Sequence, residues 1–414
     1  MSAAVPWDWF LVDSATMNPI AQLNAHDRQL QVQLNNQGKA TCWTHLLDPD
    51  TDLIVPHQTG LRLDRNGQTV YSGAIWQAND SSSASEGQQS GNDKCQITSF
   101  GWFNALGGSG QNCRLVHTGA EFQAMLAAPN GVAWQAQNGP YVSLGIDTAI
   151  QLAYDYIQFP QTSDAAIIFD LLNRANIDAP TLITPGNIYG YPIGRNLTLQ
   201  RFQNVGQQIT QLVNVESGVD FIIDPVTRQM DLYGPRASSS YLIDTGYGQD
   251  RPNAVFSYPG NCTAFSRSRD GLQTVNRMEA IGQYGVGRAD DAQSQSVNGL
   301  LEVSSSLSEV VDPNILVAYA QAEVAVKKNP WTIITFTPRP VIASDASAPG
   351  VPRPFEDFEV GDIVFARIDR GSVQVGTNGN PQATRVFGFT LDLDDSGVER
   401  LTSVQTTYQG MGGG

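Results

Sequence analysis

The sequence predicts a mainly β fold with an α+β insert, in which two related antiparallel β-barrel modules flank a middle domain. The first observation is a repeated strand pattern: residues 60–75 and residues 361–390 each contain a strand that ends in an Asp-Arg turn closed by Gly. In both copies the returning strand carries one Gly at the same phase, Gly73 or Gly388. The second observation is that the hydrophobic period changes from that of strands to that of helices between the copies. Two related modules in one subunit would turn n-fold symmetry into pseudo-2n-fold symmetry.

Length and composition limit the classes of protein to consider. A chain of 414 residues is too long for one core and predicts two to four domains. Only 15% of the residues are charged, so uncharged polar residues supply much of the surface, which suits wide subunit contacts. A net charge of −16 and a pI near 4.5 argue against tight binding to phosphate backbones. The negative net charge is compatible with a channel through which DNA passes without binding tightly.

The chain shows no secretion or membrane signal. Residues 1–9 lack the basic region and the apolar core of a signal peptide, and no apolar run approaches the roughly 18 residues of a membrane span. We therefore expect a soluble product made in a cytoplasm. The four cysteines, Cys42, Cys95, Cys113 and Cys262, form no Cys-x-x-Cys pair and are expected to be buried free thiols.

The first module is assigned to residues 1–115. Residues 29–34 alternate between polar and apolar side chains, and a turn at residues 35–38 leads to the next strand at residues 41–46. Residues 79–93 contain no apolar side chain larger than Ala and predict an exposed hairpin insertion.

The middle α+β domain is assigned to residues 116–260. Helices are expected at residues 120–126 and at residues 162–174, the second with Thr162 or Ser163 as its N-cap. A further amphipathic segment is indicated by the spacing of Phe202, Val205, Ile209, Leu212 and Val213. A hairpin is expected over residues 219–233.

The second module is assigned to residues 261–414, with one helix at about residues 312–328. Strands are expected around residues 262–282 and 331–408, including a third repeat strand at residues 401–406 that corresponds to residues 95–100. Asp312 and Pro313 have the residue types of an N-cap and a first helical position, and Lys327 and Lys328 lie at the negative end of the helix dipole.

No catalytic, cofactor-binding or metal-binding residues are predicted, and no cofactor. The histidines His26, His45, His57 and His117 lack metal-ligand spacing. Acidic clusters at residues 356–359 and 392–395 could hold a carboxylate pair or calcium, but residues 394–397 are more typical of a hairpin turn. Residues 282–288 are interpreted as a tight strand exit, since no amphipathic helix follows as a phosphate site requires. The sequence thus gives no support for an enzyme.

The order of these segments resembles the tail hub proteins of siphophages, also called minor tail proteins. The motifs that carry the resemblance are residues 60–67 with 71–73, residues 169–174, the hairpin ending at 231–233, Asn276 and Arg277 before Gly282, residues 361–364, and residues 385–388 with 394–399. The serine-rich insertion at 79–93 and residues 127–160 have no counterpart in the family.

The resemblance implies a non-enzymatic structural virion protein. It would form a homotrimeric hub at the tail tip, where each subunit gives two modules to a ring of six that caps the tail tube and forms the channel for DNA ejection. The implied partners are the distal tail protein or tail tube ring, the tape measure protein, and fibre or receptor-binding proteins at the tip, with DNA only in transit. From the net charge we also expect a net acidic channel wall.

Two other classes of protein remain. A carbohydrate- or receptor-binding tail protein would need exposed tryptophans, such as Trp76, Trp102 or Trp134, along a groove, and glycan binding would identify it. A cell-wall hydrolase would need a carboxylate pair that the sequence does not reveal, and a zymogram would identify it.

Overall fold

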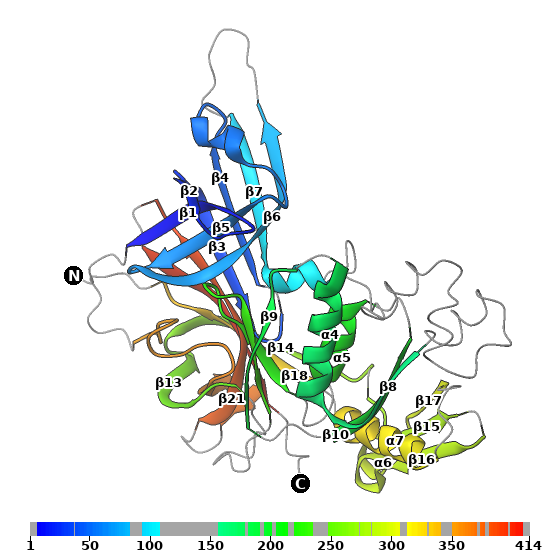
Figure 1. Ribbon diagram of the computed structural model, residues 1–414. Helices are drawn as coiled ribbons and strands as arrows, with labels where there is room; N and C mark the ends of the chain where they lie inside the picture. Colours follow the sequence, from blue (N-terminus) through cyan, green and yellow to red (C-terminus); the bar gives the residue numbers. More distant parts are fainter. Residues whose placement is uncertain are drawn as a thin grey trace, which may run out of the picture.

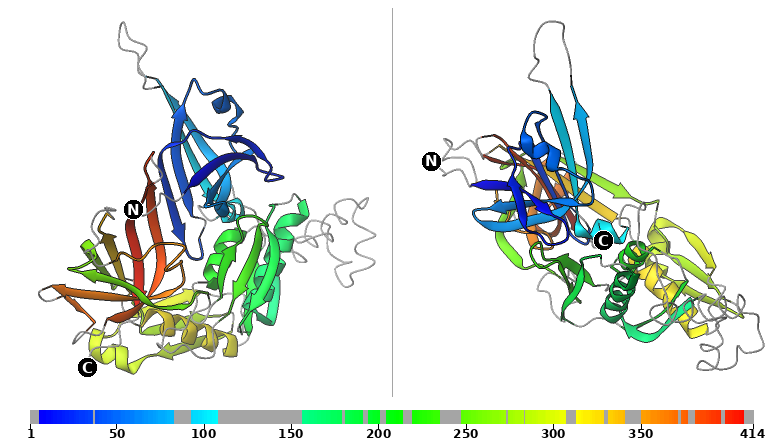
Figure 2. Two further views of the ribbon diagram at one scale, coloured as in Figure 1. Left: turned by 90° about the vertical axis from the view of Figure 1, so that its left-hand side faces the viewer. Right: turned by 45° about the horizontal axis from the view of Figure 1, so that its top comes forward.

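The first β-module occupies the N-terminal part of the chain (Figure 1). The computed structural model describes residues 6–36, 38–82, 93–107, 156–178, 181–190, 194–200, 204–213, 219–234, 247–272, 274–282, 284–306, 313–328, 331–340, 350–370, 373–376, 381–395 and 398–408. The module's elements are β1 (Trp7–Asp13), β2 (Pro19–Gln22), β3 (His26–Gln33), β4 (Lys39–His45), η1 (Pro49–Leu53), β5 (Thr59–Arg65), β6 (Gln68–Ser81), β7 (Lys94–Gly101) and η2 (Trp102–Leu106). Strands β6 and β7 project as a hairpin beyond the other strands (Figure 2).

The middle domain packs two helices against short sheets. Its elements are β8 (Tyr156–Ser163), α4 (Asp164–Asp178), β9 (Thr184–Tyr189), β10 (Gly194–Gln200), α5 (Val205–Val213), β11 (Asp220–Ile223) and β12 (Gln229–Tyr233). The predicted helix at 162–174 is confirmed as α4, and Ser163 caps it, because its Oγ accepts a hydrogen bond from the Ala166 N–H at 3.2 Å. The amphipathic segment is confirmed as α5 from Val205 to Val213, whereas Phe202 lies outside the described residues. The predicted hairpin is confirmed as β11 and β12. The expected helix at 120–126 lies outside the described residues.

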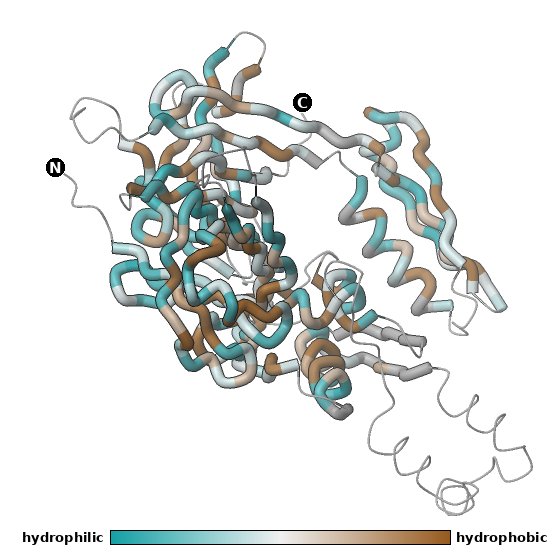
Figure 3. The backbone as a smooth tube through the Cα atoms, turned by 90° about the horizontal axis from the view of Figure 1, so that it is seen from above, coloured by the Kyte–Doolittle hydropathy of each residue, from teal (hydrophilic) through white to brown (hydrophobic). Residues whose placement is uncertain are grey.

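The second module contributes β13 (Asp250–Tyr258), β14 (Cys262–Asp270), β18 (Trp331–Pro338), β19 (Ile363–Arg370), β20 (Val373–Val375), β21 (Gln382–Leu393) and β22 (Glu399–Tyr408). Strand β13 pairs with β19, so strands of this sheet begin before residue 261. One hydrophobic core joins both modules, with Trp9, Leu30, Phe256 and Phe389 among its buried members. Hydrophobic segments gather inside the modules and along the middle-domain helices (Figure 3).

A small unit, which we call the satellite, is inserted between β14 and β18. It consists of β15 (Arg277–Ile281), β16 (Val286–Asp290), α6 (Ala292–Asn298), β17 (Glu302–Ser306) and α7 (Pro313–Lys327). Its own core contains Met278, Ala280, Leu316, Ala320 and Val324. Of the strand expected at residues 275–281, residues 277–281 form β15, which belongs to the satellite and not to the large sheet. The helix expected at 312–328 is α7. The tight strand exit after Ile281 is a hairpin, closed by a 2.8 Å hydrogen bond from the Gly282 N–H to the Gly285 carbonyl.

The repeat in the sequence corresponds to a repeat in strand order. In the first module the order is β3-β4-β7-β6-β5, and in the second it is β14-β18-β22-β21-β19. Gly73 and Gly388 are not equivalent, however, which corrects the proposed match of the return strands. Against the third strand of its repeat, β6 bulges at Trp76 and β21 bulges at Phe387, and Gly73 precedes the first of these bulges whereas Gly388 follows the second. Strand β6 has another bulge at Val70, against β5. Both glycines are needed because a Cβ atom would lie 2.3 Å from the Phe100 carbonyl oxygen or 2.9 Å from that of Val32.

The fold is therefore mainly β with an α+β insert, as predicted. Within the described ranges, no helix has both the length and the apolar character that crossing a membrane requires. Cys42, Cys95 and Cys262 are free and buried as expected, and burial raises the pKa of each of these thiols to about 12. Cys113 lies outside the described residues.

Candidate functional site

The two modules are joined by a direct strand pairing, which we call the seam. Strand β21 runs antiparallel to β3 over six residue pairs, from Gly388 opposite Gln33 to Leu393 opposite Arg28. Its central pair is Leu391 opposite Leu30, and both side chains are fully buried. The seam makes one antiparallel sheet of the eight strands β14-β18-β22-β21-β3-β4-β7-β6.

The bulges explain how β21 can serve both modules. The first half of β21 pairs with β19 up to Arg385 opposite Ile363, and the second half, from Gly388, pairs with β3. The bulge at Phe387 lies between these two halves and marks the point where β21 changes partner. The first half of β6 corresponds to the first half of β21: it pairs with β5 up to Ala74 opposite Gly60, and this pairing ends just before the bulge at Trp76.

One face of the eight-stranded sheet is polar, and we call it the polar face. The opposite face packs into the shared core. The strand register places on the polar face mostly amide and hydroxyl side chains: Gln29, Gln31, Gln33, Thr41, Gln77, Asn79, Gln96, Thr98, Ser266, Ser268, Thr335, Thr390, Ser403, Gln405 and Thr407. Its charged side chains include Lys39, Lys94, Asp392 and Arg400. A surface of this kind can form weak hydrogen bonds but has little net attraction for an anion.

A buried ion cluster connects the first module to the second, because Arg65 of the first module pairs with Glu356 and Glu399 of the second. The Arg65 side chain is 9% exposed; its Nε donates to Glu399 Oε1 at 2.6 Å and its Nη2 donates to Glu356 Oε1 at 2.7 Å. Trp7 Nε1 donates to the same Glu399 oxygen at 2.8 Å. Burial alone would lower the pKa of Arg65, but the hydrogen bonds to Glu399 and Glu356 outweigh this effect and raise it. The acidic cluster at 356–359 is therefore part of a structural contact between modules.

A second cluster ties the middle domain to both modules. Asp220, which is 6% exposed, accepts hydrogen bonds from Asn35 Nδ2 at 2.7 Å and from the Tyr247 N–H at 2.8 Å. Asp220 also forms an ion pair with Arg385 of β21. Asn35 in turn accepts from the Phe221 N–H at 2.8 Å. The end of β11 is thus fixed at the point where the two modules meet.

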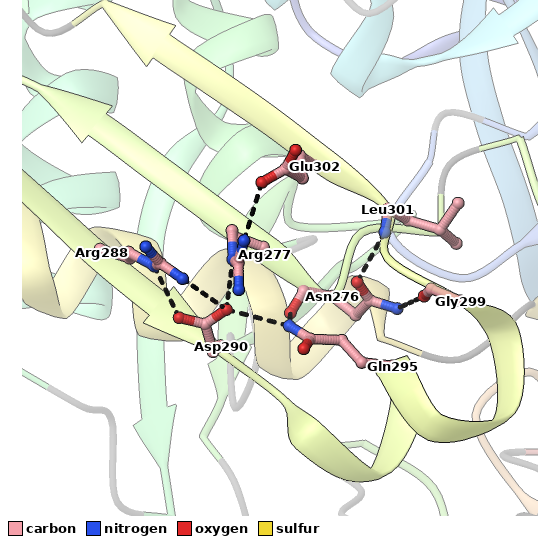
Figure 4. A network of polar contacts seen from close by, with 8 residues as sticks. All are labelled: Asn276, Arg277, Arg288, Asp290, Gln295, Gly299, Leu301 and Glu302. Carbon is pink, nitrogen blue, oxygen red and sulfur yellow. Dashed lines mark hydrogen bonds and ion pairs between the residues drawn. The ribbon is translucent and has the colours of Figure 1, made fainter.

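The satellite is held together by a polar network around Asp290 (Figure 4). Asp290 pairs with Arg277 at 2.5 Å and with Arg288 at 2.7 Å, and it accepts from Gln295 Nε2 at 2.9 Å. Hydrogen bonds from Arg288, Arg277 and Gln295 lower the pKa of this carboxyl. Arg277, one of the residues that carried the resemblance, therefore has a structural contact in this unit.

We expect the Asp290 network to lose its stabilising effect only in acid. Because the folded-state pKa lies below the ordinary value near 3.9, the contribution is fully present above about pH 4 and disappears as the pH falls through the folded-state value. Asp290→Asn should therefore lower the melting temperature at pH 6 and lower it by a smaller amount near pH 2. Thermal unfolding of both proteins at the two pH values checks this, with exposed Asp250→Asn as the control. An equal loss at both pH values would contradict it.

The histidines that were considered as site residues do not all lie at one place in the structure. His26 stacks on Trp43 with ring centroids 4.5 Å apart, and its Nδ1 lies 3.2 Å from Asp395 Oδ2. His45 also contacts Trp43, whereas His57 packs edge-on against Trp76 in another part of the module. Among the residues that the structure describes, no three His, Cys, Asp or Glu side chains gather as a metal site would require. His117 lies outside the described residues.

Trp76 and Trp102 have different surroundings, since Trp76 packs against His57 and Trp102 is buried. Trp102 is 5% exposed and donates through Nε1 to Ser72 Oγ at 2.7 Å. The Arg228 guanidinium covers its ring at 5.0 Å. Trp134 lies outside the described residues. Residues 396 and 397 of the turn expected at 394–397 lie outside the described residues; between β21 and β22, the Asp394 N–H donates to the Val398 carbonyl at 3.2 Å.

The fold is that of phage tail proteins. A tail protein from Neisseria meningitidis MC58 has a TM-score of 0.56 at 10% identity, over 98% of this chain and 97% of that chain. A prophage tail protein from Listeria monocytogenes EGD-e has a TM-score of 0.53 at 10% identity, over 97% and 94%. The 43 kDa tail protein of prophage MuSo2 from Shewanella oneidensis has a TM-score of 0.51 at 11% identity, over 96% and 97%. No family model and no curated protein matches the sequence. The resemblance is thus confirmed at the level of the fold of phage tail proteins.

Proposed function

We propose that this protein is a structural, non-catalytic subunit of a phage tail tip that assembles as a trimeric hub. The observation that carries the proposal is the seam, which places two modules of the same strand order side by side in one sheet. Three such subunits present six related modules, so a trimer can continue a tail tube that has six-fold symmetry. The shared fold with phage tail proteins supports the same conclusion.

In this trimer the polar face lines the channel for DNA ejection. Wall side chains that are mostly amides and hydroxyls hold the phosphate backbone weakly, because tight non-specific binding requires clustered Lys and Arg. The polar face carries Lys39, Lys94 and Arg400 as well as Asp392, so we propose a largely uncharged wall in place of the net acidic wall expected from composition. The net charge of −16 then lies mainly on other surfaces.

The middle domain and the satellite form the outer platform of the hub. They lie on the side of the molecule away from the first module's hairpin (Figure 1). The satellite exposes Ile281, Tyr284, Val286 and Val297, as a surface for other tip proteins would. We assign fibre or receptor-binding proteins to this platform, and the distal tail protein or tube ring and the tape measure protein to the two ends of the channel in the virion.

The first test of this proposal is the mass of the purified protein in solution. We expect a species of three times the 44.8 kDa chain mass, measured by light scattering. A stable monomer or a two-fold dimer over the micromolar range would count against the hub.

The second test concerns the wall and uses DNA binding. We expect no tight binding of duplex DNA by the wild type at physiological salt. Gln29→Lys, Gln31→Lys and Gln33→Lys together should raise affinity at low salt by roughly tenfold or more, with a steep salt dependence, because they add cations along one line of the wall. Fluorescence anisotropy measures this effect. The matched control adds the same charge at the exposed positions Gln293, Ser296 and Val297 of α6, and equal binding by both variants would contradict the assignment of the wall.

A further inference from the structure

We propose that the second half of β6 pairs with β14 of a neighbouring subunit, in the same register in which β21 pairs with β3 inside the chain. This inference rests on the proposed ring and specifies its subunit contact. In the sheet order β14 is the outermost strand at one end, and β6 is followed by β5, which pairs only with the first half of β6. Strand β14 and the second half of β6 therefore each have an edge toward a neighbour. An open edge presents unpaired backbone groups that another strand can bond.

The second half of β6 lacks the neighbour that β21 has. From Gln77 to Ser81, β6 pairs with β7 on one side, whereas its pairing with β5 ends at Ala74. The corresponding half of β21 pairs with β22 on one side and with β3 on the other. Exposure follows this difference, since Leu391 and Leu393 of β21 are buried and residues 79–81 of β6 are exposed.

The bulges give the correspondence between β6 and β21. Ile75 and Val386 are the last paired residues before each bulge, and they lie opposite Ser99 and Thr406. If the bulge residues Trp76 and Phe387 are aligned, the residues three positions later, Asn79 and Thr390, correspond to one another. The residues four positions later, Asp80 and Leu391, also correspond.

The same ladders align β14 with β3. Ser99 pairs with Ala40, which pairs with Leu30. In the second module Thr406 pairs with Ile334, which pairs with Arg267. Arg267 of β14 therefore stands where Leu30 stands in β3, and Ser268 stands where Gln31 stands.

Transferring the seam register to the open edges places Asp80 opposite Arg267 of the next subunit. Inside the chain the same position holds the buried pair Leu391 and Leu30. The two open edges thus carry opposite charges at the position where the closed seam carries two leucines. Neither Asp80 nor Arg267 forms an ion pair with any part of the chain that the structure describes. Charged edge residues discourage pairing with unrelated strands, and opposite charges select the correct partner.

A charge exchange on the full-length protein tests the contact. Asp80→Arg and Arg267→Asp each place like charges opposite one another, so each should raise the trimer dissociation constant by about tenfold or more. The double variant Asp80→Arg with Arg267→Asp restores the opposite charges and should return the constant to near the wild-type value. Analytical ultracentrifugation measures the three constants. Single variants that leave the trimer unchanged, or a double variant with no recovery, would overturn the pairing.

Cysteine cross-linking tests the register independently. Asn79→Cys with Ser268→Cys places two thiols on directly opposite residues, within disulfide reach, so mild oxidation should link subunits covalently. The control pair, Asn79→Cys with Thr263→Cys, uses an exposed position on the same strand but out of register, and it should give little product. Equal cross-linking by the control pair, or no cross-linking by the test pair in an intact trimer, would reject this contact. Neither result would contradict the trimeric hub. A wild type that forms no trimer would instead reject the hub itself.

Discussion

Replacement of Arg65 by Met is expected to lower the free energy of unfolding by about 3 kcal/mol, since removing one partner leaves the others buried without compensation. Glu399 would lose both guanidinium hydrogen bonds and Glu356 would lose one. The Met side chain retains much of the apolar stem, so the loss would come mainly from the ion cluster. Urea unfolding followed by tryptophan fluorescence measures the effect.

The matched control for Arg65 is Arg353→Met. Arg353 also contacts Glu356, but its side chain is 59% exposed, so its contribution should stay below about 1 kcal/mol. Equal effects of the two substitutions would mean that the contact between the modules does not depend on the buried cluster.

Replacement of Asp220 by Ala should cost a similar amount, about 3 kcal/mol, and should act on the attachment of the middle domain. It leaves the Arg385 cation without its carboxylate and removes the acceptor of the Asn35 amide and of the Tyr247 N–H. Hydrogen exchange should then rise first in β11, before the seam strands are affected, because β11 is attached at this junction.

The control for Asp220 is Asp52→Ala, which removes an exposed carboxyl from η1. This variant should exchange like the wild type throughout. Faster exchange spread evenly over both modules of Asp220→Ala would show that the carboxylate supports the whole sheet and not the domain junction.

Local patterns in the sequence predicted several of the helices and strands in the described residues, whereas β8, β9, β10, β17 and α6 were not predicted. Helix α5 follows from apolar residues three and four apart, and α4 from its cap and apolar face. The β11–β12 hairpin follows from its turn residues, and the alternation of residues 29–34 identifies β3.

The seam and the polar face depend on pairings that local patterns do not encode. Leu30 and Leu391 are neighbours in space but far apart in the chain, and either leucine alone is typical of any half-buried strand. The nearest signal in the sequence was the run of glutamines at positions 29, 31 and 33, which marks an uncharged polar face without saying what that face adjoins.

The two mismatches of the repeat have physical causes. Gly73 and Gly388 seemed equivalent because both are glycines in return strands, but close backbone approach from different neighbours requires each of them. Residues 275–281 have a strand pattern like any other, and only the helix α7 packed on them shows that they belong to the satellite.

A three-dimensional reconstruction of the assembled tail tip, or of the purified oligomer, by electron cryomicroscopy tests the account most directly. We expect three subunits around one channel, six β-modules in a ring, the polar face turned inward, and β6 beside β14 at each subunit boundary. A monomer or two-fold dimer, or a ring whose channel is lined by the arginines of other surfaces while the polar face points outward, would contradict the account.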